Sequence, residues 1–146
     1  MKKIVALCLI LSMAFLGGCT IFQQLFAEAD KANNFVEEFC FTLAYDGIER
    51  AKEYLHPEWA STKGNLEDYV EKFENENGID FSDGVAISRR FQESLTGYNS
   101  EYGGSVYKFG ISIVIGDKMI NMSFMVVDND AGYGIYDFGL YVPDYY

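Results

Sequence analysis

Residues 107–127, YKFGISIVIGDKMINMSFMVV, contain two alternating apolar segments joined by a short polar turn. Apolar side chains occupy every second position in 107–115 and again in 119–127. A period of two indicates β-strands with one buried face. Between the segments, Gly116 and Asp117 form a two-residue loop with glycine first, which is typical of a type II′ turn. The stretch therefore predicts an antiparallel hairpin.

One further strand is expected on each side of this hairpin. The earlier one begins near Val85, where apolar and polar residues start to alternate; its apolar set is Val85, Ile87, Phe91 and Leu95. The later one follows the turn DNDAG at 128–132 and is expected over Tyr133–Val142. Consecutive strands joined by short turns predict a four-stranded antiparallel meander.

Helical periodicity precedes the sheet. Apolar residues lie three or four positions apart from Phe22 to Leu43, which predicts a long helix ending near Gly47. A short helix is expected over Ile48–Leu55, and a third begins at Asn65, a favoured N-cap residue. Helices followed by antiparallel strands predict an α+β fold in which N-terminal helices pack on the four-stranded sheet.

The first 19 residues, MKKIVALCLILSMAFLGGC, have the features of an export signal. The apolar run over 4–15 rises ~1.5 Å per residue, which is too short to cross a hydrocarbon core of ~30 Å, but a basic flank and this length are typical of a signal peptide. LGGC at 16–19 resembles the bacterial lipobox, which implies removal of 1–18 and acylation of Cys19. A single domain over 19–146 would remain. An ordinary secretory signal or an uncleaved anchor are the alternatives.

The lipobox resemblance implies a lipoprotein of the bacterial cell envelope, held at the membrane by palmitate or similar acyl chains. Thr20 after the cysteine resembles outer-membrane sorting if the host is Gram-negative. Without Lys2 and Lys3, nine basic residues remain against 22 acidic ones, a net charge of −13. Such a surface repels phosphate, so we expect no nucleic-acid partner, and the acyl chains rather than a basic patch hold the protein down.

Cysteine usage indicates that the fold depends on its core. Cys8 would leave with the signal and Cys19 would be acylated, so Cys40 has no partner for an internal disulfide. Cys40 lies on the apolar face of the long helix, where a free cysteine commonly packs as a small hydrophobic residue. We expect a buried thiol rather than a nucleophile.

The other candidate chemical groups are few. His56, the only histidine, precedes Pro57 where the short helix ends, and we expect a structural rather than a catalytic role. DNDAGYG at 128–134 suggests a calcium loop, but Tyr133 and Gly139 stand where such a loop needs glycine and glutamate, so a hairpin turn is favoured. We predict no catalytic residue, no metal site and no cofactor.

The order of elements resembles the NTF2-like (cystatin-like) superfamily, particularly its small lipoprotein members. The resemblance rests on the long helix, on GIERAKEYLHPEW at 47–59 and on the closing hairpins. The last strand departs from the family, which usually carries a tryptophan where this chain has GYGIYDFGLY at 132–141. The resemblance implies a cone whose inner sheet face lines a pocket. Six aromatic residues would line it: Phe91, Tyr107, Phe109, Phe124, Tyr136 and Phe138.

Two classes of function remain. If these aromatic side chains fill the core, which is the favoured interpretation, the domain is a non-catalytic binding or scaffolding module. Its partner, another envelope protein, would contact the tyrosines of the C-terminal YVPDYY, namely Tyr141, Tyr145 and Tyr146. If they instead line an open cavity, the domain binds a small ligand or is an enzyme. A frayed tail is the alternative interpretation of YVPDYY.

Overall fold

The computed structural model describes residues 26–59 and 64–143, except for the side chains of 91–96. The predicted signal peptide, Cys19, Tyr145 and Tyr146 lie outside the described residues.

The chain divides into two compact units, Met1–Lys31 and Ala32–Tyr146. The described part of the first unit, residues 26–31, is helical. The second unit contains the sheet, the later helices and every site described below.

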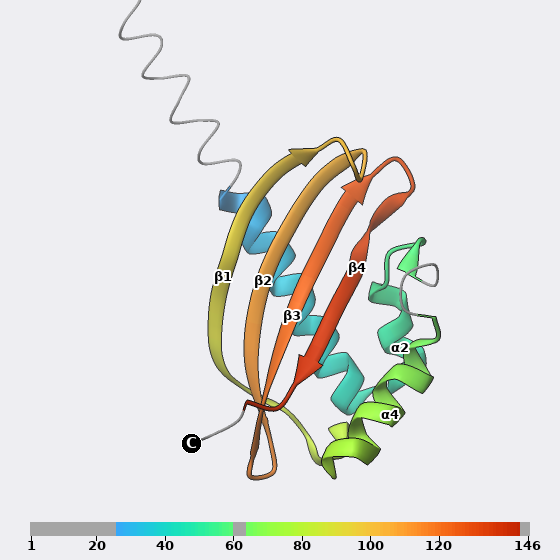
Figure 1. Cartoon of the computed structure of the whole chain (residues 1–146), viewed down its shortest axis with the longest axis vertical. Helices are drawn as coiled ribbons and strands as arrows, with labels where there is room; N and C mark the ends of the chain where they lie inside the picture. The colour runs from blue at the N-terminus through green and yellow to red at the C-terminus, as the bar shows by residue number, and fades with distance from the viewer. Residues whose placement is uncertain (1–25, 60–63, 144–146) are drawn as a thin grey trace, which may run out of the picture. The chain divides into compact units, whose positions relative to one another are not determined.

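The sheet is antiparallel and four-stranded, with the strands side by side in chain order (Figure 1). Its strands are β1 (Ala86–Asn99), β2 (Gly104–Ile115), β3 (Lys118–Asn129) and β4 (Gly132–Tyr141). Gly116 has a φ of 60°, and no non-glycine residue of the described chain has a positive φ. This combination is the one that a type II′ turn requires. The predicted meander is confirmed.

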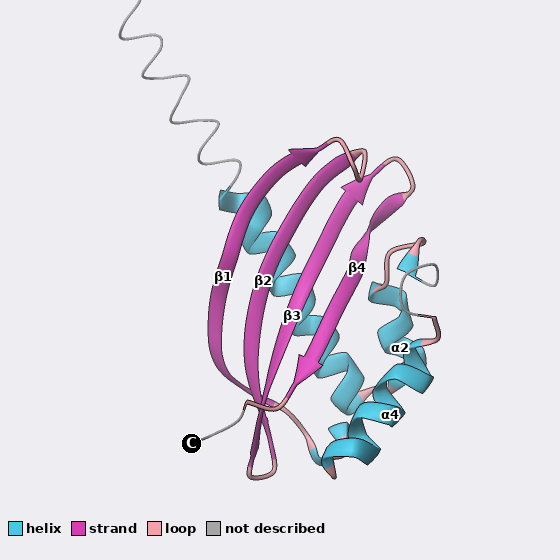
Figure 2. Cartoon of the chain, in the orientation of Figure 1, coloured by secondary structure: helices cyan, strands magenta, loops and turns pink. Residues whose placement is uncertain are grey.

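Helices precede the strands, which confirms the α+β prediction. Residues 32–45 are helical and cross one face of the sheet, while α2 (Ile48–Ala51) and α4 (Leu66–Asn77) lie on the side of β4 (Figure 1). Two 3₁₀ turns complete the described elements, η1 (Lys52–Tyr54) and η2 (Phe81–Asp83). Among the described residues of the second unit, no helix lies over the opposite face of the sheet (Figure 2).

The helix boundaries follow local chemistry. The predicted helix over Ile48–Leu55 is shorter than expected, because η1 replaces its second half and Leu55 is extended. The side chain of Asn65 caps α4 by accepting a hydrogen bond from the Glu67 amide at 3.1 Å, as predicted. Gly78 ends this helix with a φ of 59°, a left-handed conformation that glycine adopts without steric cost.

The long helix contributes an apolar stripe to the core. Phe39 is fully buried, and its ring lies 6.0 Å from that of Phe124 and 5.2 Å from that of Phe138. On the next position of the helix, Cys40 Sγ lies 3.7 Å from Met122 Sδ. These contacts join the helix to β3 and β4.

β-Bulges change which residues share a face of the sheet, and this corrects the sequence prediction for Tyr136. A register shift between Ile87 and Arg89 places Phe91 opposite Gly110 and Gln92 opposite Phe109. The predicted pocket position of the Phe91 side chain lies outside the described residues. A second irregularity pairs Met125 with Asp137 but Val126 with Ile135, leaving Tyr136 as the extra residue. One inserted residue inverts the alternation of side chains between the two faces of the sheet, so Tyr136 does not join the aromatic side chains around Phe138.

The two edges of the sheet are protected differently. On β4, Leu55 forms a parallel bridge with Ile135. Further along, the Tyr69 hydroxyl donates to the Phe138 carbonyl at 3.4 Å and accepts from the Leu140 amide at 3.3 Å. On β1, three register irregularities interrupt the ladder. Bulges and covered edges both discourage pairing with another chain.

Candidate functional site

The segment Leu55–Trp59, here called the strap, joins η1 to the edge of β4. The strap begins with Leu55 in an extended conformation, at φ −76° and ψ 141°. Pro57 favours an extended conformation of His56, the residue directly before it. The His56 amide donates to the Ile135 carbonyl at 2.9 Å. The strap therefore continues the sheet for one residue beyond β4.

Glycine in β4 allows this close approach. A Cβ atom on Gly134 would lie 2.6 Å from the His56 nitrogen and 2.8 Å from its Cα. Both are backbone atoms that cannot move aside without lifting the strap. The glycine is therefore a requirement of the docked strap, which sequence analysis did not recognise.

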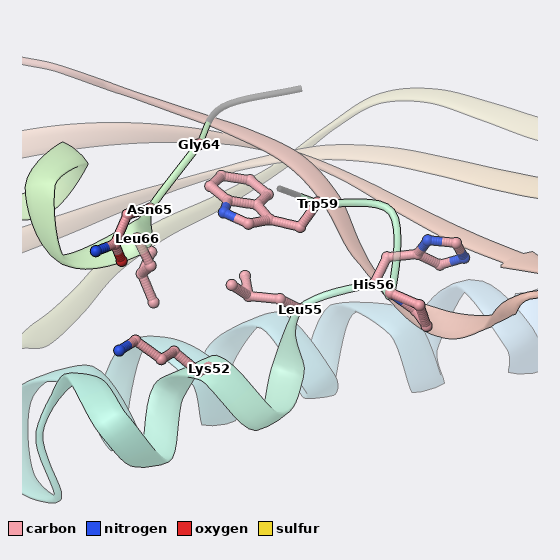
Figure 3. A pocket seen from close by; sticks show the side chains of 8 residues that line it. Lys52, Leu55, His56, Trp59, Gly64, Asn65 and Leu66 are labelled. Atoms are coloured by element: carbon pink, nitrogen blue, oxygen red, sulfur yellow. The ribbon is translucent and has the colours of Figure 1, made fainter. Parts of the chain in front are cut away.

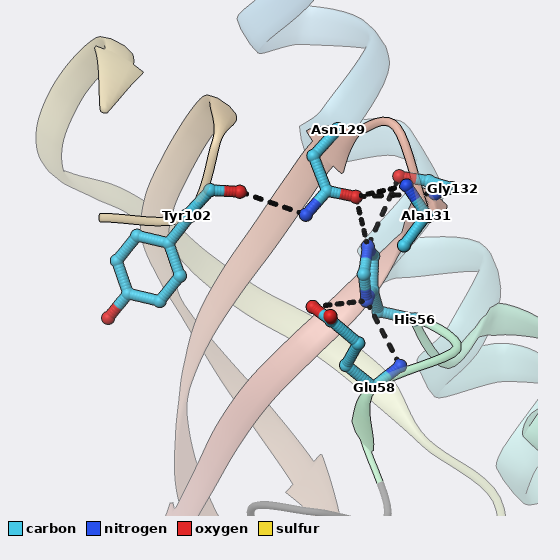
Figure 4. A network of polar contacts seen from close by, with 6 residues as sticks. All are labelled: His56, Glu58, Tyr102, Asn129, Ala131 and Gly132. Carbon is cyan, nitrogen blue, oxygen red and sulfur yellow. Dashed lines mark hydrogen bonds and ion pairs between the residues drawn. The ribbon is translucent and has the colours of Figure 1, made fainter. Parts of the chain in front are cut away.

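His56 ties the strap to the turn between β3 and β4 (Figure 4). Its Nε2 lies 3.1 Å from Asn129 Oδ1 and 3.2 Å from the Gly132 carbonyl oxygen. Its Nδ1 lies 3.2 Å from the Glu58 amide nitrogen, which donates to it. A nitrogen facing acceptors must carry the proton, and one facing an N–H must not. The contacts thus select the neutral imidazole protonated on Nε2.

The orientation of the Asn129 amide supports this tautomer. Its Oδ1 accepts from the Ala131 amide at 2.9 Å and from the Gly132 amide at 3.3 Å, while its Nδ2 donates to the Tyr102 carbonyl at 2.9 Å. Exchanging the amide atoms would break all three contacts. Oδ1 therefore faces His56, as an acceptor for Nε2–H.

The same contacts leave His56 without a free nitrogen for catalysis. Its side chain is 0% exposed. A general acid or base must reach a substrate proton within hydrogen-bonding distance, directly or through water. Here both nitrogens are within hydrogen-bonding distance of groups of the protein itself.

Aromatic rings extend the network along the same end of the sheet. The Tyr136 ring lies 5.4 Å from His56 and 5.2 Å from Tyr102. The pKa of Tyr102 is raised, first by burial and then by the nearby charges of Glu101, Tyr136 and Asp137. Tyr136 was predicted in the aromatic pocket, whereas the structure places it with His56.

A surface recess of about 460 Å³ opens beside the strap (Figure 3). The imidazole of His56 points away from Lys52 and Leu55, toward β4 (Figure 3). The ammonium group of Lys52 contacts Glu49 and lies 3.9 Å from Glu67, so its charge is already compensated. The recess is lined by Lys52, Leu55, His56, Pro57, Trp59, Gly64, Asn65 and Leu66.

Four other predicted aromatic residues lie in the core, and two of them, Phe124 and Phe138, belong to a cluster of packed rings. Tyr107, Phe109, Phe124 and Phe138 are all buried. Phe138 is at its centre, with four other rings at centroid distances of 5.1 to 5.7 Å; these are Phe39, Trp59, Tyr69 and Phe124. The rings of Trp59 on the strap and Tyr69 on α4 are not predictable as members of this cluster, because nothing in the local sequence pattern shows which face of the sheet they cover.

Solvent exposure distinguishes two other predicted positions, Cys40 and Tyr141. Cys40 is fully buried, and desolvation, with a smaller effect of Glu37, raises the pKa of its thiol far above the ordinary value. Glu37 forms an ion pair with Arg90 on β1. Tyr141 is 47% exposed at the end of β4, as a partner surface requires, but Tyr145 and Tyr146 lie outside the described residues.

In residues 26–59 and 64–143, no group of three His, Cys, Asp or Glu side chains is placed to hold a metal ion. No helix of the same residues combines the length and the apolar character needed to span a membrane. No protein-family model matches the chain, and neither a curated protein nor a solved structure shows significant similarity to it.

Proposed function

We propose that this chain is a lipid-anchored protein of the bacterial cell envelope whose NTF2-like domain is a non-catalytic binding or scaffolding module. Export and anchoring follow from the resemblance of residues 16–19 to the lipobox. The assignment to the NTF2-like superfamily is supported by a long helix lying across an antiparallel sheet, with shorter helices beside β4.

The observation that carries the non-catalytic assignment is the packing around Phe138. Its side chain is 1% exposed and lies against four other rings. An enzyme or ligand-binding domain of this architecture would need a concave, accessible space there, with convergent polar groups. The described side chains instead bring aromatic edges and faces together, and the single histidine is engaged on both nitrogens.

The partner surface that we propose is the end of β4 and the tail that follows it. Tyr141 and Val142 are exposed large side chains at this end. Exposed tyrosine combines apolar area with a hydroxyl group and is favoured at interfaces. The acidic surface of the protein favours a partner with basic residues around its contact site.

The alternative is a small-ligand-binding domain, and the recess beside Trp59 is the specific observation in its favour. Its volume is within the range of ligand pockets, about 300–1,000 Å³. Its walls are mainly apolar, with Leu55, Trp59 and Leu66 among them. A bound small molecule would therefore be expected at the strap rather than between the long helix and the sheet.

Two experiments test the proposal. Intact-mass analysis of membrane fractions from the native host should show loss of residues 1–18 and added acyl mass on Cys19, and Cys19→Ala should release the protein from membranes. Crosslinking and pull-down should then compare the whole chain with one truncated after Val142. Identical partner recovery would exclude the tail, and a small molecule retained in native mass spectra would favour the alternative.

A further inference from the structure

The neutral state of His56 depends on the position of the strap. The unprotonated Nδ1 accepts from the Glu58 amide at 3.2 Å. A second proton on the imidazole would have to bind Nδ1, and two donors would then face each other. The backbone at Glu58 would have to move for a protonated His56 to be accommodated.

A second partner for that proton is already close. Glu58 Oε2 lies 3.8 Å from His56 Nδ1. A carboxylate is the natural acceptor for an imidazolium N–H, and the pair would be charge-assisted. Glu58 thus offers His56 two alternative contacts, its amide for the neutral ring and its carboxylate for the charged one (Figure 4).

Among residues 26–59 and 64–143, few titratable groups contact the ring. The strap contributes Glu58, and β4 contributes the ring of Tyr136 at 5.4 Å. On the turn between β3 and β4, Asn129 and the Gly132 carbonyl are neutral. Asp128 and Asp130, which flank Asn129, have exposed side chains. The contacts of Nε2 are with acceptors, so they persist when the ring is charged.

Movement at Glu58 would be transmitted to Trp59. The Trp59 amide donates to the His56 carbonyl at 2.9 Å, and its ring stacks on Phe138 at 5.1 Å with an interplanar angle of 16°. Glu58 lies in the turn that begins at Pro57, and Trp59 follows it directly. A change of the His56–Glu58 contact therefore alters the anchor of the strap on the core.

We propose that His56 is a proton-sensitive catch. In its neutral form, His56 holds the strap against the β3–β4 turn. When Nδ1 takes up a proton from solvent, its partner changes from the Glu58 amide to the Glu58 carboxylate, and Trp59 loosens from Phe138. Histidine is the side chain whose charge ordinarily changes between about pH 5 and 8. The catch needs no lipid anchor, so its failure would leave the proposed function standing.

The composition of the chain makes the test direct, because it contains one histidine and one tryptophan. The full chain in detergent micelles is titrated from pH 8 to pH 5. The imidazole Cε1–H signal in NMR reports the charge of His56, and the Trp59 emission wavelength with acrylamide quenching reports the strap. Wavelength and quencher access are used because a protonated imidazole can quench a nearby indole without any movement.

We expect a red shift of Trp59 emission and greater acrylamide access along the same transition as the His56 signal. His56→Gln keeps an amide donor for Asn129 but does not titrate, so its emission should not change with pH. Glu58→Gln removes the carboxylate acceptor and should move both transitions to lower pH. Glu53→Gln, a change on η1 at a residue paired with Arg50, is the matched control and should leave them in place.

Two results would overturn the proposal. One is a Trp59 emission that stays constant while the His56 signal titrates, which would separate the ring charge from the strap. The other is a Trp59 emission transition in His56→Gln at the same pH as in the wild type, which would show that another group causes the transition. If His56→Gln does not fold, the coincidence of the two wild-type transitions and the Glu58→Gln shift still decide the outcome.

Discussion

Trp59 stacks on Phe138 with ring centroids 5.1 Å apart, although the two residues belong to the strap and to the last strand. The contact joins the strap to the centre of the aromatic core. Aromatic pairs of this kind contribute about 0.5–1.5 kcal/mol beyond the burial of their area. The strap is therefore part of the core, and its integrity should depend on Phe138.

Phe138→Ala should be among the most damaging substitutions in the sheet. It removes a ring that is 1% exposed and lies against four others, so we expect a loss of about 3–5 kcal/mol in the free energy of unfolding. Urea denaturation followed by circular dichroism measures it. Tyr141→Ala, at an exposed site of the same strand, should cost less than about 1 kcal/mol. Equal losses in the two variants would contradict the packing described here.

Gly134→Ala should dislodge the strap. The added methyl group would approach the His56 backbone to 2.6–2.8 Å, and overpacking of this kind costs about 1–3 kcal/mol. We expect a lower unfolding temperature together with a red-shifted Trp59 emission in the native state. Gly97→Ala on β1, where no atom lies within 4 Å of the new Cβ, is the matched control. Native-like Trp59 emission in Gly134→Ala would show that the strap is not held as described.

Tyr69→Phe should weaken the protection of the β4 edge. It keeps the ring that packs on Phe138 but removes the hydroxyl that binds the Phe138 carbonyl and the Leu140 amide. We expect a loss of about 1 kcal/mol and faster amide hydrogen exchange at Leu140. Tyr98→Phe, at a tyrosine that is 76% exposed, should change neither quantity. Unchanged exchange at Leu140 in Tyr69→Phe would argue against the cap.

The Cys40 thiol should be inert in the folded protein. Burial raises its pKa, so almost no reactive thiolate is present near neutral pH. In a chain carrying Cys8→Ser and Cys19→Ser, iodoacetamide at pH 8 should leave Cys40 unmodified until denaturant is added, as measured by mass spectrometry. Ser100→Cys in the same chain places a thiol on an exposed turn and should react at once. Rapid native-state alkylation of Cys40 would contradict the buried position.

Lowering the pH should weaken η2, the 3₁₀ turn before β1, because Asp80 caps it. Hydrogen bonds from Ser82, from its side chain and then from its amide at 2.8 Å, hold the pKa of Asp80 below its ordinary value. A carboxyl group with a lowered folded pKa stabilises the protein above its unfolded pKa, and this stabilisation disappears as pH falls through the folded value. We expect Asp80→Asn, which keeps an acceptor oxygen, to make the unfolding temperature less dependent on pH between about 5 and 2. An identical pH dependence in wild type and Asp80→Asn would refute this.

Several features of the fold could be predicted from short stretches because neighbouring residues decide them. The alternation in 107–115 specifies a strand with one buried face, and glycine at position 116 specifies the turn that follows. The Asn65 side chain caps the helix that begins one residue later. In each case the deciding interaction lies within a few positions along the chain.

The candidate site could not be predicted in this way. A single extra residue in β4 moves Tyr136 away from Phe138 and toward His56, and an irregularity in β1 places Phe91 opposite Gly110. Alternation alone does not locate such bulges, because either phase is compatible with the local pattern.

The order of elements, the acidic surface and the local turns and caps of this protein can all be predicted from its residues in order along the chain. The tertiary structure decided the partners of His56, since its Nε2 meets an asparagine 73 positions further along the chain. It also decided that Trp59 covers Phe138 and that Gly134 must lack a side chain. These contacts form only when segments far apart in the chain come together, and the residues of one segment do not show which other segment it will meet.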